Sequence, residues 1–404
     1  MTRFLRSLSC AVFMAGFAVL GTAHAQKGDT VRPEVGKPLQ AAQALVKARK
    51  GRDALAEVAK AEAVPNRTAY ENFLIQQMRG SAAVLAGENE TAIKAFEAVL
   101  NSGRVKGRDA TQMVQAIAVA HYQKKDYGRA AQWTQRYFKE GGNDPQMRTV
   151  LLQSYFLAND CASVSRMVGA AMEEASRRPS EEELQMLANC YLRQNNTGAY
   201  VDAIKKLVVH YPKKQYWTDL MARVQKKPGF SDRLGLHVYR LRAATGNLTS
   251  ANDYMEMAQL ALQAGVPAEA KAVIDKGYAS GALGKGEQAD RHGRLRDLAQ
   301  KSLAESQAKR EQELQEAQAA KDGNALVALG LNFVHEGNAA KGLQLIEQGI
   351  KKGGLRRPDD AKLALGEAQY LAGQKDRAAR TLRDVKGKDG TADLAELWVL
   401  HARA

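Results

Sequence analysis

The chain is poor in several residue types, and each shortage excludes a class of protein. Aromatic residues make up only 6% of the 404 residues, which argues against a β-sandwich or a β-barrel. Three cysteines are too few for a disulfide-rich scaffold, and 45% hydrophobic residues are too many for wholesale disorder. The long runs of Ala, Leu, Lys, Glu and Gln that remain favour helices.

Length and charge set the next limits. At about 150 residues per domain, the length predicts either two or three globular domains or one extended array of repeats. The formal net charge is +15, so a basic surface is expected on some part of the chain.

Long apolar runs are confined to the beginning of the chain. Arg3 and Arg6 precede an apolar run over residues 8–21, which is followed by Ala23-His24-Ala25. This is the layout of a secretory signal, so we predict a signal peptide over residues 1–25, cleavage near Ala25 and a periplasmic protein. No later run is long enough to span a bilayer, so no transmembrane segment is expected after cleavage.

Export to an oxidising compartment makes Cys161 and Cys190 candidates for a disulfide. Cys190 lies in an apolar helical pattern, and Cys161 follows Asn159-Asp160, which indicates a turn. The sequence is also explained by a buried side chain at Cys190 and an unpaired turn thiol at Cys161, which is the interpretation we favour at this point. Pairing remains open.

The whole chain after the signal has a period of about 36 residues. Gly80, Gly330 and Gly366 each lie seven residues before a second glycine, namely Gly87, Gly337 or Gly373. A small residue permits two helices to cross closely, and a glycine permits the turn between them. The ten predicted units begin near Lys37, Phe73, Thr111, Gln146, Glu181, Tyr216, Ala251, Glu287, Gly323 and Asp359.

Each unit reads as two helices, because apolar residues recur three or four positions apart on both sides of the turn. Ser180 with Glu183, and Thr68 with Glu71, are predicted capping boxes at helix starts. Tyr211-Pro212 is expected to end a second helix.

The recurring glycine, the alanine after the turn and a closing proline such as Pro212 resemble the tetratricopeptide-repeat (TPR) pattern. The segments 31–38 and 254–258 are similar to those of exported TPR proteins of proteobacteria. The resemblance implies an all-α, right-handed superhelical solenoid of antiparallel helix pairs, with a concave groove that binds peptides or protein elements. The predicted organisation is a signal peptide (1–25), an extended segment (26–36), an N-terminal repeat array (37–286), a charged helical spacer or degenerate repeat (287–322), and C-terminal repeats with a capping helix (323–404).

The segment 287–322 departs from the pattern, because charged residues crowd it and no turn residue separates Leu295 from Ala320. We interpret it as one long helix or a poorly broken pair that separates two stacks. The sequence does not decide between the two forms.

Groove residues follow from the resemblance, at places two, five, nine and twelve of each first helix. Amides and aromatic rings at such places suit contacts to an extended peptide or a helix. The nominated residues are Gln112, Gln115, Val119, Tyr122, Gln185, Asn189, Leu192, Trp217 and Leu220.

No pattern in the sequence supports catalysis, a metal site or a cofactor. Ser306 and Lys309 have the spacing of a serine–lysine pair, but they lie in the most polar helix and lack the accompanying elements. His335-Glu336 is only half of a zinc-binding helix, and the glycines around Lys285 do not have phosphate-loop spacing. We therefore expect a protein that is not an enzyme.

Positive charge is concentrated in residues 205–242, which hold ten basic residues against Asp219 and Asp232. Aromatic residues are interleaved with them, so the segment predicts a patch that attracts polyanions. The patch is assigned to Lys213, Lys214, Arg223, Lys226, Lys227, Arg233, Arg240 and Arg242.

Two functions remain after these exclusions. The first is a non-catalytic periplasmic scaffold that binds a protein partner in the cell envelope. The second is a factor that binds an anionic glycan or polymer, or membrane headgroups, through the basic patch. An exported protein is not expected to meet nucleic acid, and neither the partner nor the oligomeric state is specified by the sequence.

Overall fold

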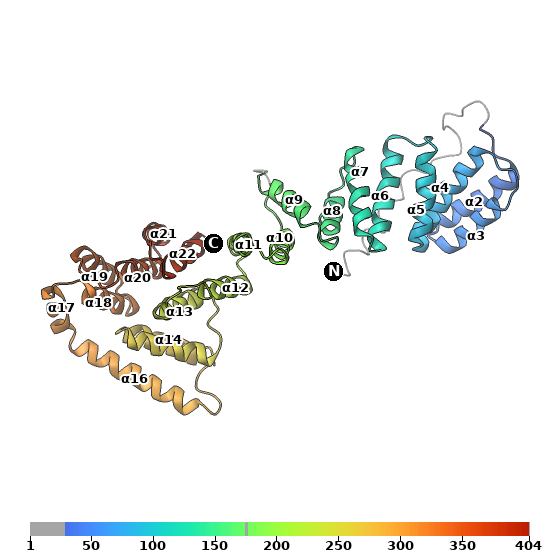
Figure 1. Cartoon of the computed structure of the whole chain (residues 1–404). Helices are drawn as coiled ribbons and strands as arrows, with labels where there is room; N and C mark the ends of the chain where they lie inside the picture. Colours follow the sequence, from blue (N-terminus) through green and yellow to red (C-terminus); the bar gives the residue numbers. More distant parts are fainter. Residues whose placement is uncertain (1–28, 174–176, 404) are drawn as a thin grey trace. The chain divides into compact units, whose positions relative to one another are not determined.

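The computed structural model describes residues 29–173 and 177–403, and all regular structure within them is helical. The predicted all-α fold of antiparallel helix pairs is confirmed (Figure 1). The predicted signal peptide over residues 1–25 lies outside the described residues. In the part of the chain that is described, no helix is both long enough and apolar enough to cross a membrane.

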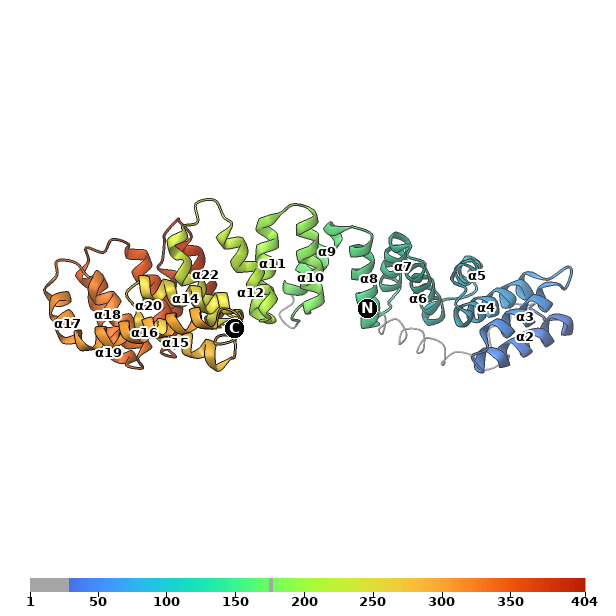
Figure 2. The same cartoon turned by 90° about the horizontal axis from the view of Figure 1, so that it is seen from below.

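The chain divides into two compact units, with the boundary between Gln194 and Asn195. In unit 1, each helix packs against the helix that follows it, as Figure 2 shows for α2 to α10. Its helices are α2 (Pro33–Lys47), α3 (Gly51–Glu62), α4 (Ala69–Ala86), α5 (Asn89–Asn101), α6 (Gly107–Gln123), α7 (Tyr127–Lys139), α8 (Pro145–Leu157), α9 (Cys161–Glu173) and α10 (Glu181–Arg193).

The first helix begins earlier than the sequence predicted. Residues 33–36 were expected in an extended segment, but α2 begins at Pro33. Proline is favoured at the first helical position because its missing N–H has no partner there, and Glu34 complements the positive end of the helix.

Both predicted capping boxes are confirmed. Thr68 Oγ1 accepts from the Glu71 backbone N–H at 3.1 Å, and Glu71 Oε2 accepts from the Thr68 N–H at 2.8 Å. Ser180 and Glu183 exchange the same two bonds. Each pair satisfies two N–H groups that have no partner within the helix.

The small residues of the repeat pattern lie where helices cross. A Cβ added to Gly80 would be 2.6 Å from Phe96 Cδ1, and one added to Gly330 would be 2.5 Å from Ile346 Cγ1. Gly337 ends its helix with φ of 90°, a conformation that favours glycine. The spacing of seven residues thus links a helix crossing to the turn that follows it.

Unit 2 holds the remaining helices and brings its two ends together. Its last helix, α22, packs not only on α20 and α21 but also on α11 and α13, and Figure 1 shows α22 beside α11. The helices are α11 (Thr197–His210), α12 (Lys214–Gln225), η1 (Asp232–Leu234), α13 (Gly235–Ala244), α14 (Ala251–Gln263), α15 (Pro267–Ala279), α16 (Ala289–Ala308), α17 (Arg310–Ala319), α18 (Asn324–His335), α19 (Ala339–Lys352), α20 (Pro358–Leu371), α21 (Lys375–Arg383) and α22 (Thr391–Arg403).

The division into two units differs from the predicted domain organisation. The array predicted over 37–286 is divided between the two units, because helices from 195 onward pack against the C-terminal helices. The segment 287–322 does not separate two stacks, since α15 contacts α18 directly. Asn332 on α18 donates to the Gly265 carbonyl at 2.9 Å and accepts from the Ala268 N–H at 3.3 Å. The segment forms α16 and α17, which meet at Lys309 and run beside the stack.

Candidate functional sites

A row of hydrogen-bonded polar side chains crosses three consecutive first helices of unit 1, namely α6, α8 and α10. Tyr122 on α6 donates through its hydroxyl to Gln153 Oε1 on α8 at 2.8 Å. Gln153 Nε2 donates in turn to Glu182 Oε1 on α10 at 3.0 Å. We call Tyr122, Gln153 and Glu182 the polar ladder. Tyr122 was predicted, whereas Gln153 and Glu182 were missed because only their contacts with neighbouring helices single them out.

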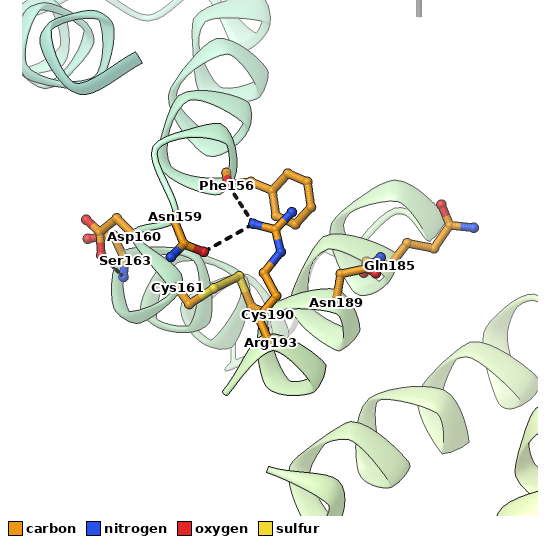
Figure 3. The surroundings of a disulfide bond; sticks show 9 residues. All are labelled: Phe156, Asn159, Asp160, Cys161, Ser163, Gln185, Asn189, Cys190 and Arg193. Atoms are coloured by element: carbon orange, nitrogen blue, oxygen red, sulfur yellow. Dashed lines mark hydrogen bonds between the residues drawn. A yellow bond between two sulfur atoms is a disulfide. The ribbon is translucent and has the colours of Figure 1, made fainter. Parts of the chain in front are cut away.

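Two predicted groove residues lie on α10 near the end of this ladder. Asn189 is exposed and donates through Nδ2 to the Gln185 carbonyl at 2.9 Å, and Gln185 is half-buried. Figure 3 shows both side chains projecting from α10 away from the sulfur atoms of a disulfide. Leu192, one turn further along, is 49% exposed. This end of unit 1 therefore offers an amide beside an exposed apolar side chain.

Gln115 does not line an open groove, contrary to the prediction. It is buried, and its Nε2 donates at 3.0 Å to Asp144 Oδ2. Asp144 is the N-cap of α8 and accepts from the Gln146 N–H at 2.8 Å. Gln115 thus positions the start of the next helix, while Gln112 and Val119 on the same helix are half-buried.

Cys161 and Cys190 form a disulfide between α9 and α10, so the unpaired interpretation is wrong (Figure 3). The two Cα atoms are 5.3 Å apart. Beside the disulfide, the Arg193 guanidinium lies 4.3 Å from the centre of the Phe156 ring and donates to the Phe156 carbonyl at 3.2 Å. These contacts fix α10 against the end of α8. The pairing was missed because Cys161 is the first residue of α9, whereas Cys190 lies on α10, which belongs to the following repeat.

Trp217 and Leu220 are core residues of unit 2 and not groove residues. Leu220 is fully buried and Trp217 is 2% exposed. The Trp217 ring meets the edge of His401 on α22, with ring centres 5.5 Å apart. Their positions in the repeat predicted that they line an open groove, but α22 covers this side of α12.

Arg240, which was assigned to the basic patch, is buried in a cluster of charged side chains. Its guanidinium donates twice to Glu269, at 2.6 and 2.7 Å, and once to Glu367 at 2.9 Å. His237 Nδ1 lies 2.9 Å from Glu367 Oε2, and His335 Nε2 lies 3.7 Å from Glu269 Oε2. The five residues come from α13, α15, α18 and α20. We call this set the buried ionic cluster.

Electrostatics within the buried ionic cluster follow from burial and from the arginine. Burial alone would raise the pKa of Glu269, but the attraction of Arg240 outweighs it and lowers that pKa below its usual value. Burial lowers the pKa of His335. The cluster therefore keeps the Glu269 carboxylate charged. Because Arg240 donates to both Glu269 and Glu367, it is not available to an external polyanion.

Four more members of the predicted basic patch are paired with carboxylates of unit 2. Arg223 pairs with Asp219 at 3.1 Å, Lys227 with Asp393 at 2.6 Å and Arg242 with Asp253 at 2.6 Å. Arg233 bridges Asp360 and Asp389. The last three predicted members, Lys213, Lys214 and Lys226, are exposed at the two ends of α12.

Unit 2 contains a cleft of about 870 Å³ between α16 and α17 on one side and α18, with the adjoining ends of α14 and α15, on the other. Ser306 and Lys309 line it, but within the described residues no hydrogen bond joins them and no third group orients them. A nucleophile needs such a base and such an orienting partner. The described part of the chain also holds no group of three or more His, Cys, Asp or Glu side chains that could bind a metal ion.

Neither a protein-family model nor a curated protein matches the chain. Among solved structures, a chain of the Naa15/Naa10 complex bound to HypK-THB is similar at 16% identity and a TM-score of 0.34, and the match covers 88% of this chain but only 59% of that one.

Two further structures match over most of both chains. Yeast Tom70 has 11% identity, a TM-score of 0.25 and coverage of 91% and 95%. The TPR domain of P58(IPK) has 10% identity, a TM-score of 0.22 and coverage of 90% and 96%. Because these scores are low, the assignment of the fold rests on the helix pairs of the chain itself.

Proposed function

We propose that the protein is a non-catalytic, TPR-like scaffold of the cell envelope that binds a protein partner through the polar ladder and Asn189 of unit 1. The observation that carries the proposal is the chain of hydrogen bonds from Tyr122 through Gln153 to Glu182, which joins three consecutive first helices. Side chains held in this way lose little freedom when a ligand binds, which lowers the entropic cost of recognition.

The chemistry of the face suits a peptide main chain. Amide, hydroxyl and carboxylate groups donate to and accept from backbone C=O and N–H groups, which every extended peptide presents at regular intervals. Leu192, which is 49% exposed, adds an apolar contact close to Asn189. Such a surface recognises an extended segment chiefly by its backbone.

The proposed location rests on two features. Arg3 and Arg6 before the apolar run, with Ala25 at the expected cleavage position, support export. The Cys161–Cys190 disulfide supports an oxidising compartment such as the periplasm, because disulfides persist there and are rare in the cytosol.

Binding of an anionic glycan or polymer is the second candidate, and it now depends on fewer residues. Most of the predicted patch is paired with carboxylates of unit 2. Lys213, Lys214 and Lys226 have exposed side chains at the two ends of α12. Polyanion binding through such lysines falls steeply as salt rises. Replacing all three by Gln should abolish binding to an envelope glycan fraction if this candidate is right.

Quantitative capture from an envelope extract tests the first candidate. The baits are the wild-type protein, an Asn189→Arg/Gln153→Ala variant and a control, Gln132→Arg, whose position is exposed on the second helix α7. We expect wild type and control to enrich the same protein, and the ladder variant to lose it by roughly tenfold or more, as for an interface hot spot. Retention at about 0.5 M salt is expected, since the contacts are mainly hydrogen bonds. Equal capture by all three baits would reject the assignment of the site.

A further inference from the structure

The cleft in unit 2 exists because α16 and α17 leave the stack and return to it. α16 packs against α14 and α15 through Leu295 and Ala299. α17 packs against α18, where Ala317 contacts Leu326. Between these two supports the pair of helices stands away from α18, and the space of about 870 Å³ remains. Because both ends are pinned by buried contacts, the cleft is formed before any ligand arrives.

Additional polar contacts hold α17 in place. Arg310, its first residue, pairs with Glu336 at the end of α18. Lys352, at the end of α19, donates to the Gln318 carbonyl at 2.6 Å. The outer wall of the cleft is therefore fixed by ion pairing and hydrogen bonding as well as by apolar packing.

The outer wall, formed by α16 and α17, is polar and mainly acidic. Ser302, Glu305, Lys309, Glu313 and Glu316 line the cleft at spacings of three or four residues, so they form one stripe along the two helices. Glu313 is half-buried, while Glu305 and Glu316 are exposed. The stripe thus carries three carboxylates and one ammonium group, that of Lys309, although the net charge of the chain is +15.

The contacts of Glu305 and Glu316 within the chain are weak. Glu305 lies 3.9 Å from the exposed Lys301, and Glu316 accepts from Gln312 at 2.8 Å. Exposed pairs of this kind contribute little, so their carboxylates can exchange partners readily. The outer wall thus presents negative charge to whatever enters the cleft.

The inner wall is apolar and has small side chains. Ala325, Ala328 and Leu329 line it from α18, Leu262 lines it from the end of α14, and Pro267 lines it from the start of α15. Alanines permit a helix to approach closely. The amide of Asn332, also in this wall, is already bonded to Gly265 and Ala268.

Leu298 on α16 adds an exposed apolar group at the mouth of the cleft. Its side chain is 51% exposed, although the neighbouring Leu295 is buried against α14 and α15. Because about half of the Leu298 side chain is still in contact with water, a ligand that covers it buries additional apolar surface. This burial favours binding.

We propose that this cleft binds an amphipathic helix of a partner protein, with leucine-sized side chains against α18 and Lys or Arg side chains toward Glu305, Glu313 and Glu316. The two walls select these two faces, because one is apolar and the other is acidic. An acidic or a uniformly polar segment matches neither combination. The site belongs to unit 2, so its test does not depend on whether the polar ladder of unit 1 binds a protein.

A pair of model peptides tests the proposal on the full-length protein. The probe is a fluorescein-labelled peptide of about 14 residues, or four helical turns, with Leu on one face and Lys on the other. Its partner has Glu in place of every Lys. Binding is measured by fluorescence anisotropy at several salt concentrations. We expect the Leu–Lys peptide to bind and the Leu–Glu peptide to bind at least about tenfold more weakly.

Three variants locate the binding. Glu313→Lys/Glu316→Lys should weaken the Leu–Lys peptide by about tenfold or more, because like charges then oppose it. Ala325→Trp, which fills the cleft, should do the same without changing the acidic wall. Glu311→Lys is the matched control, since Glu311 is exposed and lies two positions from Glu313, on nearly the opposite side of α17. It should change the affinity by less than about twofold, as for a distant surface charge.

Several results would overturn the proposal. These are equal binding of both peptides, equal loss in the Glu311→Lys control, unchanged binding in Ala325→Trp, or concentration-dependent dimers that exclude the peptide and so place a second copy in the cleft. Circular dichroism must show the same melting curve for each variant. If the double charge reversal does not fold, Glu305→Lys and Ala325→Trp decide the question.

Discussion

The two units are built from similar helix pairs, but they are closed in different ways. In unit 1 each helix contacts its immediate neighbours along the chain, and one disulfide joins α9 to α10. In unit 2 the last helix contacts the first, and charged side chains far apart in sequence meet. Lys205 pairs with Glu396 across 191 positions, and Arg240 with Glu367 across 127. Unit 1 is therefore held by local contacts, and unit 2 depends on long-range ones.

The comparison changes the meaning of the basic segment over residues 205–242. In a stack with only local contacts, these cations would face solvent or a ligand. In unit 2, carboxylates from α15, α20 and α22 and from the turn before α22 reach several of them. A concentration of charge in sequence is thus a sign of internal pairing as much as of a binding surface.

The largest expected effect comes from removing the arginine of the buried ionic cluster. Arg240→Met leaves Glu269 and Glu367 buried without their cation, and breaking a buried pair in this way costs about 3–5 kcal/mol. In a Trp133→Phe background, urea unfolding followed by tryptophan fluorescence reports on Trp217 and Trp398 of unit 2 alone. We expect unit 2 to unfold at clearly lower urea.

Replacing the carboxylates as well should recover part of the loss. Arg240→Met/Glu269→Gln/Glu367→Gln no longer buries unpaired charge, so it should be more stable than Arg240→Met alone. A triple variant that is no more stable than the single one would contradict the electrostatic explanation.

The next effect concerns unit 1 only. Cys161→Ser/Cys190→Ser removes a crosslink between residues 29 positions apart, which stabilises by about 3 kcal/mol through the unfolded state. Hydrogen exchange should show faster opening of α8 to α10 and no change in unit 2. Addition of a thiol reductant to wild type should reproduce the change, and protection lost equally in both units would show that the units are not independent.

Glycines at helix crossings should matter equally in both units. Gly80→Ala in unit 1 and Gly330→Ala in unit 2 each place a Cβ against a packed side chain, and such overpacking costs about 1–3 kcal/mol. Gly128→Ala is the control, because nothing lies within 4 Å of its added Cβ. Denaturant titration of the three variants checks this, and a harmless Gly330→Ala would show that α18 and α19 can separate without loss.

The smallest effect is on acid stability. The Arg32 hydrogen bond lowers the pKa of Glu71 from 4.5 to about 2, so the charged carboxylate stabilises the folded state above pH 4.5 and this contribution disappears as pH falls toward 2. Arg32 is 41% exposed, so solvent weakens the pair. Glu71→Gln should melt at a lower temperature than wild type at pH 7, and the gap should close between pH 4.5 and 2. A gap that stays constant over that range would assign the effect to lost packing.

The local features could be predicted from the sequence because their causes lie within one repeat. The capping box at Thr68 needs a glutamate three residues later, and the crossing at Gly80 needs a turn at Gly87. The long-range features could not be predicted in the same way. Nothing near Arg240 indicates Glu367, and Trp217 occupies a groove position until α22 covers it.

The candidate site was predictable only in part for the same reason. Tyr122, Gln185 and Asn189 followed from their place in the repeat, whereas Gln153 and Glu182 join them only through contacts between repeats. The outer wall of the cleft in unit 2 lies within residues 287–322, where the sequence departs from the repeat pattern. The pattern could therefore indicate that this segment is not an ordinary repeat, but it could not predict a cleft.

The central claim is that unit 1 binds a protein through the polar ladder and Asn189. Photocrosslinking tests this claim most directly. A photoreactive phenylalanine analogue is placed at Asn189, on that face, or at Gln132, which is exposed on α7. The protein is then irradiated in the cells that express it, and the adducts are identified by mass spectrometry. The account predicts one protein adduct from position 189 and none from position 132. The same adducts from both positions, or an adduct from position 132 alone, would contradict it.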